Sequence, residues 1–132
     1  MIKAKRSLGQ NFLVDNNILD KIVNIINIKG KNILEIGPGS GNLTNAILRK
    51  NPRELIVIEK DESLVSILKK KFKDTIIIKN NDVLKINEKK LSKDKLSVFG
   101  NLPYNISTEI LCNWILNLEN EKFWFESLIL MF

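Results

Sequence analysis

The chain has 132 residues, a mass of 15.2 kDa and a formal net charge of +6 at pH 7, a size that suits one domain with its own core. A single cysteine and no histidine exclude an internal disulfide framework, a Ser-His-Asp triad and histidine metal ligands. No stretch reaches the roughly 18 apolar residues of a membrane span or has the apolar core of a signal peptide, so we expect a protein of the reducing cytoplasm without a metal or membrane partner.

The first predicted helix and strand lead into a glycine-rich loop. Asp15 is placed to cap a helix that runs to about Ile28, because apolar residues recur at helical spacing between them, and Gly30 follows as its end. Residues 32–36 form an apolar run of strand length, and residues 37–41 supply the glycine-rich turn. A strand, a tight turn and a new helix in that order predict the start of a nucleotide-binding α/β unit.

Strands and helices go on alternating to the end of the chain, which is typical of an α/β domain with a mostly parallel sheet. The next helix is expected to stop at about Lys50, and Asp61 and Ser107 are placed to cap two more. Because strands buried on both faces need helices on both sides, we expect residues 1–132 to be the first part of a larger domain, with the sheet cut after its fifth strand. The four further strands are predicted at residues 54–59, 75–79, 96–100 and 127–132.

The segment Leu34–Gly41, with the sequence LEIGPGSG, is the first candidate binding motif. Gly37 and Gly39 allow a sharp turn and let a ligand approach the backbone without a Cβ clash. The acidic Glu35 suits a ligand with a cationic end, such as the amino group of a methionine moiety. The spacing is G-x-G-x-G rather than G-x-G-x-x-G, which disfavours a nicotinamide dehydrogenase. A plain tight turn is the competing interpretation.

Two acidic residues follow the next two predicted strands. Glu59 ends the second strand, where a carboxylate can accept both hydroxyls of a ribose. Asp82, in the run Asn80-Asn81-Asp82-Val83, could accept from the exocyclic amine of an adenine. A solvated strand end would explain Glu59 alone, and a turn would explain Asp82 alone. The glycine loop nearby favours the binding interpretation for Glu59.

The segment Asn101-Leu102-Pro103-Tyr104 is the most informative motif, and it follows the fourth predicted strand. Proline fixes the backbone and holds Leu102 extended, so the Leu102 carbonyl and the Asn101 side chain can converge on one amino group. The ring of Tyr104 offers a face on which a base can stack. A turn with a core tyrosine is the alternative.

Taken together, these motifs resemble the ribosomal RNA adenine N6-dimethyltransferase family, whose members are class I S-adenosylmethionine-dependent enzymes. The matching elements occur in family order and cover the chain from about Lys5 onward. The forms SLGQNFL and NLPYNIS are more similar to the small-subunit enzymes than to the macrolide-resistance branch, which modifies large-subunit RNA. The resemblance implies a Rossmann-like α/β fold. The motifs that carry it are Gln10–Leu13, LEIGPGSG, Glu59, the Asn-Asn-Asp run ending at Asp82, and Asn101–Ser107.

The resemblance also implies a role for each matching residue. Those assigned to S-adenosylmethionine are Asn11 and Leu13 closing over it, Gly37, Gly39 and Glu35 at its methionine part, Glu59 at its ribose, Asp82 with Val83 at its adenine, and Lys60 as a further cofactor contact. Those assigned to the target base are Asn101, which is also counted as a cofactor contact, Leu102, Pro103 and Tyr104.

The implied substrate is a pair of adjacent adenosines in a hairpin near the 3′ end of small-subunit ribosomal RNA, which places the protein in ribosome biogenesis. The mildly basic charge of the chain is compatible with an RNA partner. We expect a monomer when full length, with a helical C-terminal domain beyond Phe132. Two alternatives stay open: a non-catalytic RNA-binding or ribosome-assembly factor, and a large-subunit enzyme of the macrolide-resistance type.

Overall fold

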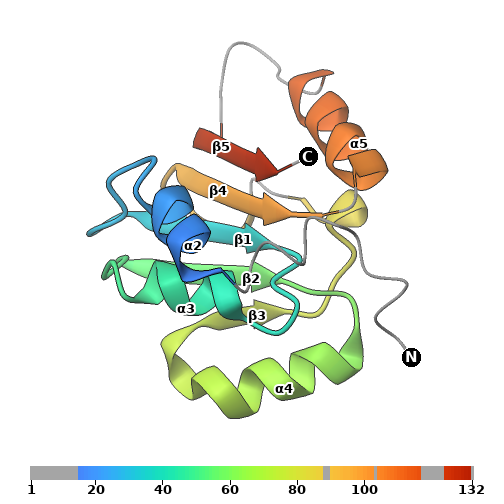
Figure 1. The fold of residues 1–132 in the computed structure, drawn as a ribbon. Helices are drawn as coiled ribbons and strands as arrows, with labels where there is room; N and C mark the ends of the chain where they lie inside the picture. The colour runs from blue at the N-terminus through green and yellow to red at the C-terminus, as the bar shows by residue number, and fades with distance from the viewer. Residues whose placement is uncertain (1–14, 88–89, 103, 117–123, 132) are drawn as a thin grey trace.

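The computed structural model describes residues 15–87, 90–102, 104–116 and 124–131. Within them, five parallel strands form one sheet in the order β3-β2-β1-β4-β5. The chain moves outward from β1 to β3 and then returns to place β4 on the other side of β1, so the strand order reverses between β1 and β4. All carboxyl ends lie at one edge of the sheet (Figure 1). The strands are β1 (Asn32–Ile36), β2 (Glu54–Ile58), β3 (Ile77–Lys79), β4 (Leu96–Asn101) and β5 (Phe125–Met131).

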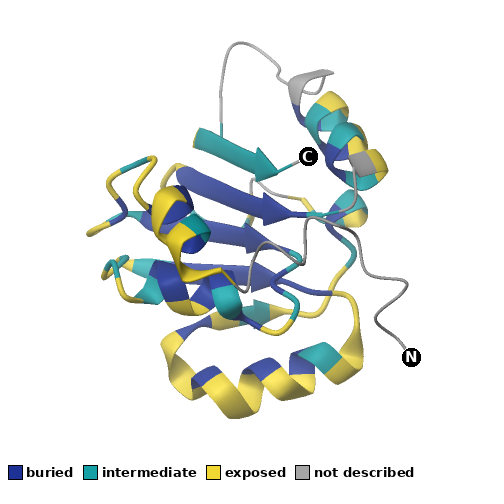
Figure 2. Ribbon diagram, viewed as in Figure 1, coloured by how far each residue is buried: buried dark blue, intermediate teal, exposed yellow. Residues whose placement is uncertain are grey.

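Helices cover both faces of this sheet, as buried parallel strands require. Apolar residues of α2, α3 and α4 pack with one set of strand residues, whereas α5 and the short 3-10 turn η3 pack with the opposite set. The central strands β1 and β4 are buried along their whole length (Figure 2). The helical elements are α2 (Asn16–Val23), α3 (Asn42–Leu48), α4 (Glu62–Phe72), α5 (Tyr104–Leu116), η2 (Lys73–Thr75) and η3 (Val83–Lys85).

Two helix caps that the sequence predicts are confirmed. The Asp15 carboxylate accepts from the backbone N–H of Asn17 at 2.8 Å, and that of Asp61 accepts from the backbone N–H of Ser63 at 2.8 Å. The hydrogen bonds from the Ser63 hydroxyl and backbone N–H lower the pKa of Asp61. These caps fix the starts of α2 and α4, and the start of α4 follows directly on the end of β2.

The first helix is shorter than predicted. It ends at Val23 rather than near Ile28, and the side-chain amide of the C-cap residue Asn24 donates to the Asp20 carbonyl at 2.7 Å, which satisfies one carbonyl of the last turn. Ile28 is buried all the same, in the segment between helix and strand. The apolar spacing therefore correctly predicted which residues are buried but not where the helix ends.

The prediction that Ser107 caps a helix is wrong. That helix, α5, begins at Tyr104, and Ser107 lies buried within it. The third strand begins at Ile77 rather than Thr75, because residues 73–75 form η2, and the fifth begins at Phe125. In the part of the chain that the structure describes, no helix is long and apolar enough to cross a bilayer.

Candidate cofactor and target-base site

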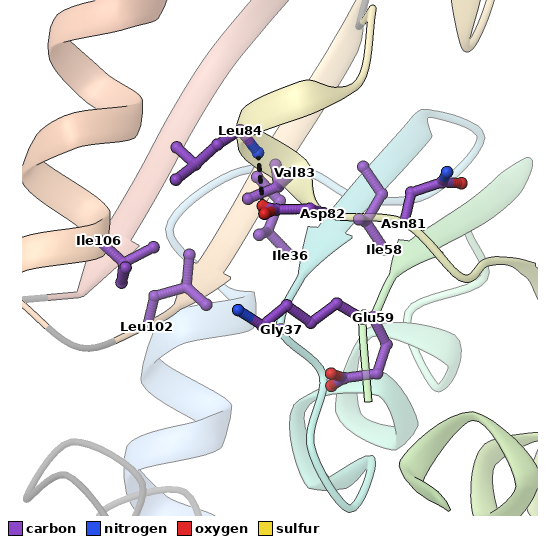
Figure 3. Close-up of a pocket in the computed structure, with 11 residues that line it drawn as sticks. Ile36, Gly37, Ile58, Glu59, Asn81, Asp82, Val83, Leu84, Leu102 and Ile106 are labelled. Carbon is purple, nitrogen blue, oxygen red and sulfur yellow. Dashed lines mark hydrogen bonds between the residues drawn. The ribbon is translucent and has the colours of Figure 1, made fainter. Parts of the chain in front are cut away.

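A cavity of about 240 Å³ lies at the carboxyl edge of the sheet, where β1 and β2 end and face η3 and the start of α5 (Figure 3). Most of its wall is apolar, and two carboxylates lie at its rim. A slot with apolar walls and a few polar groups is the usual form of a site for a flat heterocycle. The lining residues are Ile36, Gly37, Ile58, Glu59, Lys60, Asn81, Asp82, Val83, Leu84, Leu102 and Ile106.

The glycine loop forms one side of this cavity, and its glycines have positive φ angles, which other residues adopt only at a cost in free energy. Gly37 has φ +66° and its N–H donates to the Ile58 carbonyl at 3.0 Å, which ties the loop to the end of β2. A Cβ on Gly37 would collide with the side chain of Leu102. Gly39 has φ +57°, and a Cβ there would meet nothing within 4 Å. The loop therefore packs tightly at Gly37 and leaves an open backbone surface at Gly39.

Glu59 holds the glycine loop from the end of β2. One carboxylate oxygen accepts from the Gly39 N–H at 3.4 Å and the other from the Asp61 N–H at 3.1 Å. The side chain is buried, yet it lines the cavity, and a carboxylate has further lone pairs to offer. The position is therefore suited to accept hydrogen bonds from a diol in the cavity.

Asp82 lies opposite, just before η3. Its Oδ1 accepts from the Leu84 N–H at 3.0 Å, and Figure 3 shows the carboxylate between Leu84 and Ile36. The bond caps η3 and leaves the second oxygen for a donor in the cavity. The buried side chain of Val83 follows directly and forms part of the apolar wall.

Glu35 is not brought into the cavity. Its side chain leaves β1 on the face that α3 covers, is 1% exposed, and accepts from the Thr44 hydroxyl at 2.5 Å. Burial raises the pKa of Glu35; the hydrogen bond from Thr44 lowers it and the nearby Glu59 carboxylate raises it by a smaller amount, so the net pKa is about 8. The Glu35 carboxyl therefore contacts α3 and does not line the cavity.

The second half of the site lies at the end of β4. Asn101 is the last residue of the strand and is 4% exposed. Since side chains alternate along a strand, Asn101 and Leu102 project to opposite sides, and Leu102 lines the cavity. Ser107 of α5 is fully buried nearby, and its hydroxyl donates to the Leu102 carbonyl at 3.4 Å.

The structure thus brings together most of the residues singled out from the sequence. Gly37, Glu59, Lys60, Asp82, Val83 and Leu102 line the cavity, Gly39 contacts Glu59, and Asn101 adjoins Leu102. Asn11, Leu13 and Pro103 lie outside the described residues, and for Tyr104 only its place at the start of α5 is described. Sequence reasoning missed the apolar walls, namely Ile36, Ile58, Leu84 and Ile106, because apolar residues at strand and helix ends give no signal of which cavity they face.

The strand order, the glycine loop after β1 and the acidic residue after β2 define the class: this is a Rossmann-like methyltransferase fold of class I. Solved structures with the same fold include a dimethyladenosine transferase from Plasmodium falciparum, with TM-score 0.68 and 28% identity over 89% of this chain and 41% of that one. The 23S rRNA methyltransferase ErmE is similar too, with TM-score 0.66 and 25% identity over 78% of this chain and 41% of that one.

The family is also clear. The family model described as ribosomal RNA adenine dimethylase matches residues 1–132, and the chain belongs to this family. It is 61% identical over 131 residues to the ribosomal RNA small subunit methyltransferase A of Pelagibacter ubique, and 41% identical over 136 residues to that of Wolbachia pipientis. The matches cover 99% and 100% of this chain but 50% of each relative. The chain therefore spans about half the length of these curated relatives.

Proposed function

We propose that residues 1–132 form the cofactor-binding half, and part of the base-binding half, of an S-adenosylmethionine-dependent methyltransferase that dimethylates N6 of adenosines in small-subunit ribosomal RNA. One observation supports this most strongly: a slot with carboxylates on two sides adjoins the Asn101-Leu102 segment at the strand-order reversal. The small-subunit assignment rests on the names of the curated relatives.

The residues of the cavity fit the chemistry of S-adenosylmethionine. Asp82 offers an acceptor for an exocyclic amine beside the apolar walls, Glu59 offers acceptors for ribose hydroxyls, and Gly39 leaves the backbone open to the methionine part. When bound, this cofactor supplies a methyl group already activated by its sulfonium centre. The protein's own contribution is then orientation and electrostatics.

The Asn101-Leu102 segment would orient the target. The Asn101 amide oxygen and the Leu102 carbonyl would accept the two N6 hydrogens and turn the nitrogen lone pair, otherwise conjugated with the ring, toward the methyl donor. Tyr104 would stack on a base taken out of the RNA helix. As the N–C bond forms and the S–C bond of the donor breaks to leave a neutral thioether, the same carbonyl dipoles would stabilise the positive charge that develops on nitrogen, and one N6 proton would then be lost to water.

The test uses a chimera in which residues 1–132 are joined to the half of the Pelagibacter ubique relative that lies beyond the match. We expect methyl transfer from radiolabelled S-adenosylmethionine to small ribosomal subunits that lack the methyl groups, with N6-dimethyladenosine as the product. Transfer to large-subunit RNA alone would favour the macrolide-resistance type. RNA binding without transfer would favour a non-catalytic assembly factor, and either result would contradict the proposal.

A further inference from the structure

Ser107 makes an unusual pair of contacts next to the proposed target-base site. Its side chain is fully buried in α5, and its hydroxyl lies 3.4 Å from the Leu102 carbonyl oxygen and 3.5 Å from that of Met131. One hydroxyl proton serves one acceptor at a time, and both distances exceed the ordinary 2.7–2.8 Å or so of an O–H···O bond. The hydroxyl therefore sits between two acceptors rather than on one.

These acceptors are not the ones a helical serine ordinarily uses. A serine within a helix tends to bond back to a carbonyl of its own helix, about one turn earlier. Leu102 precedes α5, and Met131 is the last residue of β5. Ser107 thus joins three elements: the segment after β4, the helix that follows it, and the end of the neighbouring strand.

We propose that Ser107 is a positioning residue, which holds the Leu102 carbonyl in the orientation that accepts an N6 hydrogen of the target adenine. The inference rests on the proposed function, because the Leu102 carbonyl accepts a hydrogen bond from substrate only in that mechanism. A carbonyl oxygen has two lone pairs, so one can take the Ser107 hydroxyl while the other faces the base.

The second acceptor lets the Leu102 carbonyl leave this orientation when no base is bound without leaving the buried Ser107 hydroxyl unpaired. A buried hydroxyl left without a partner is costly. Met131 pairs with Asn101 in the register of β4 and β5, and its carbonyl can take the Ser107 proton whenever Leu102 turns away. The same hydroxyl therefore links the Leu102 carbonyl to the strand that flanks Asn101, and so ties together the two groups proposed to grip N6.

Ser97 provides a matched control. It is a second fully buried serine, on β4 itself, and its hydroxyl has no hydrogen-bond partner among the described residues. Removing the Ser97 hydroxyl should therefore remove a buried polar atom and no positioning contact. A comparison of Ser107→Ala with Ser97→Ala separates the loss of a specific bond from the loss of a buried hydroxyl in general.

The experiment places Ser107→Ala, Ser107→Thr and Ser97→Ala in the chimera described above. We expect Ser107→Ala to lower kcat by about 3- to 10-fold, the effect of one lost hydrogen bond, with unchanged KM for RNA and Kd for S-adenosylmethionine. Ser107→Thr, which keeps the hydroxyl, should restore most of kcat, and Ser97→Ala should match the parent.

A second readout does not depend on catalysis. A hairpin RNA that carries 2-aminopurine at the target position reports binding by fluorescence, and this base has no amino group at C6. We expect the parent and Ser107→Ala to bind it equally, because there is no N6 hydrogen for the Leu102 carbonyl to accept. If Ser107→Ala lowered 2-aminopurine binding and thermal stability together with kcat, the role of Ser107 would be purely structural and the inference would be overturned.

The remaining outcomes separate the two proposals. An active parent with an unchanged kcat in Ser107→Ala would overturn the role of Ser107 and leave the proposed function standing. A parent that transfers no methyl group to adenine would contradict the proposed function, and the inference would fall with it. If Ser107→Ala does not fold, Ser107→Cys replaces it, since a thiol leaves no cavity but donates only weakly. A parent-like kcat in Ser107→Cys would overturn the inference.

Discussion

The ends of β1 and β2 differ from the ends of β4 and β5 in how their groups are held. In the first region, every residue of β1 is buried, and Glu59 binds two backbone N–H groups of the surrounding loops. In the second, β4 is buried throughout, whereas its neighbour β5 is half-buried or exposed along its whole length (Figure 2). The proposed cofactor side, at β1 and β2, is thus fixed by contacts within the described chain, while the proposed target side, at β4 and β5, depends on α5 and on the edge strand of the described sheet.

This difference suggests that cofactor binding and base positioning are separable properties of the chain. The two sides meet where Ile36 of β1 pairs with Gly100 of β4, and beyond the strands where Leu102 packs against Gly37. Side-chain substitutions away from this boundary should leave the other side intact, whereas a change at the contact of Gly37 with Leu102 should disturb both.

The largest expected effect is on the target side. Asn101→Ala removes the amide oxygen proposed to accept an N6 hydrogen, so methyl transfer by the chimera should fall by more than about a hundredfold. Affinity for S-adenosylmethionine, measured by calorimetric titration, should stay close to that of the parent. An equal loss of transfer and of cofactor affinity would contradict the role assigned to Asn101.

The contact between the two sides is tested by Gly37→Ala. A Cβ there adds the cost of a positive φ to a collision with Leu102, so the free energy of unfolding should fall by about 2–4 kcal/mol. Gly39→Ala is the matched control, because its φ is similar but the space around it is open; it should cost about 1–2 kcal/mol. Urea unfolding measures both, and equal losses would show that the Leu102 contact is unimportant.

On the cofactor side, Glu59→Ala should weaken S-adenosylmethionine binding by about 1–3 kcal/mol, because ribose hydroxyls would lose their acceptors. The exposed Glu62, in the first turn of α4, serves as the control, and Glu62→Ala should bind as the parent does. An unchanged affinity in Glu59→Ala would remove Glu59 from the cofactor site.

The smallest effect concerns Glu35 and pH. Its pKa is raised to about 8 in the folded chain, so its contribution to stability is fully present below its ordinary pKa of 4.5 and is lost as the pH rises through 8. Glu35→Gln keeps an acceptor for Thr44 and cannot ionise. Between about pH 5 and pH 8, the variant should gain at least about 1 kcal/mol over the parent in urea unfolding. If the free energies of unfolding of the variant and the parent changed in parallel with pH, Glu35 would already be charged at neutral pH and its raised pKa would be contradicted.

The strands and the order of the site motifs could be predicted from sequence because each depends on local chemistry. The apolar runs of β1 and β2 end where a glycine or an acidic residue begins the next segment, and that of β4 ends at an asparagine. Asp15 and Asp61 cap their helices by bonds to residues two positions away. Such signals involve few residues and do not depend on the rest of the fold.

The features that could not be predicted are the face of the sheet to which a side chain points and the contacts between residues far apart in the sequence. The residues on either side of Glu35, Leu34 and Ile36, are both apolar, so the sequence did not show that this carboxyl faces Thr44 rather than the cavity. Serine is a common helix N-cap, which is why the sequence predicts a cap at Ser107. In the structure its hydroxyl instead lies near a carbonyl 24 residues away on β5. The slot walls at Leu84 and Ile106 likewise form only once η3 and α5 fold over the sheet.

The most direct test of the central claim is a crystal structure of the chimera with S-adenosylhomocysteine, the product form of the donor. The account predicts adenine in the slot between β2 and η3, its amine bonded to Asp82, and the ribose hydroxyls on Glu59. An empty slot, or a ligand bound elsewhere on the sheet, would contradict it.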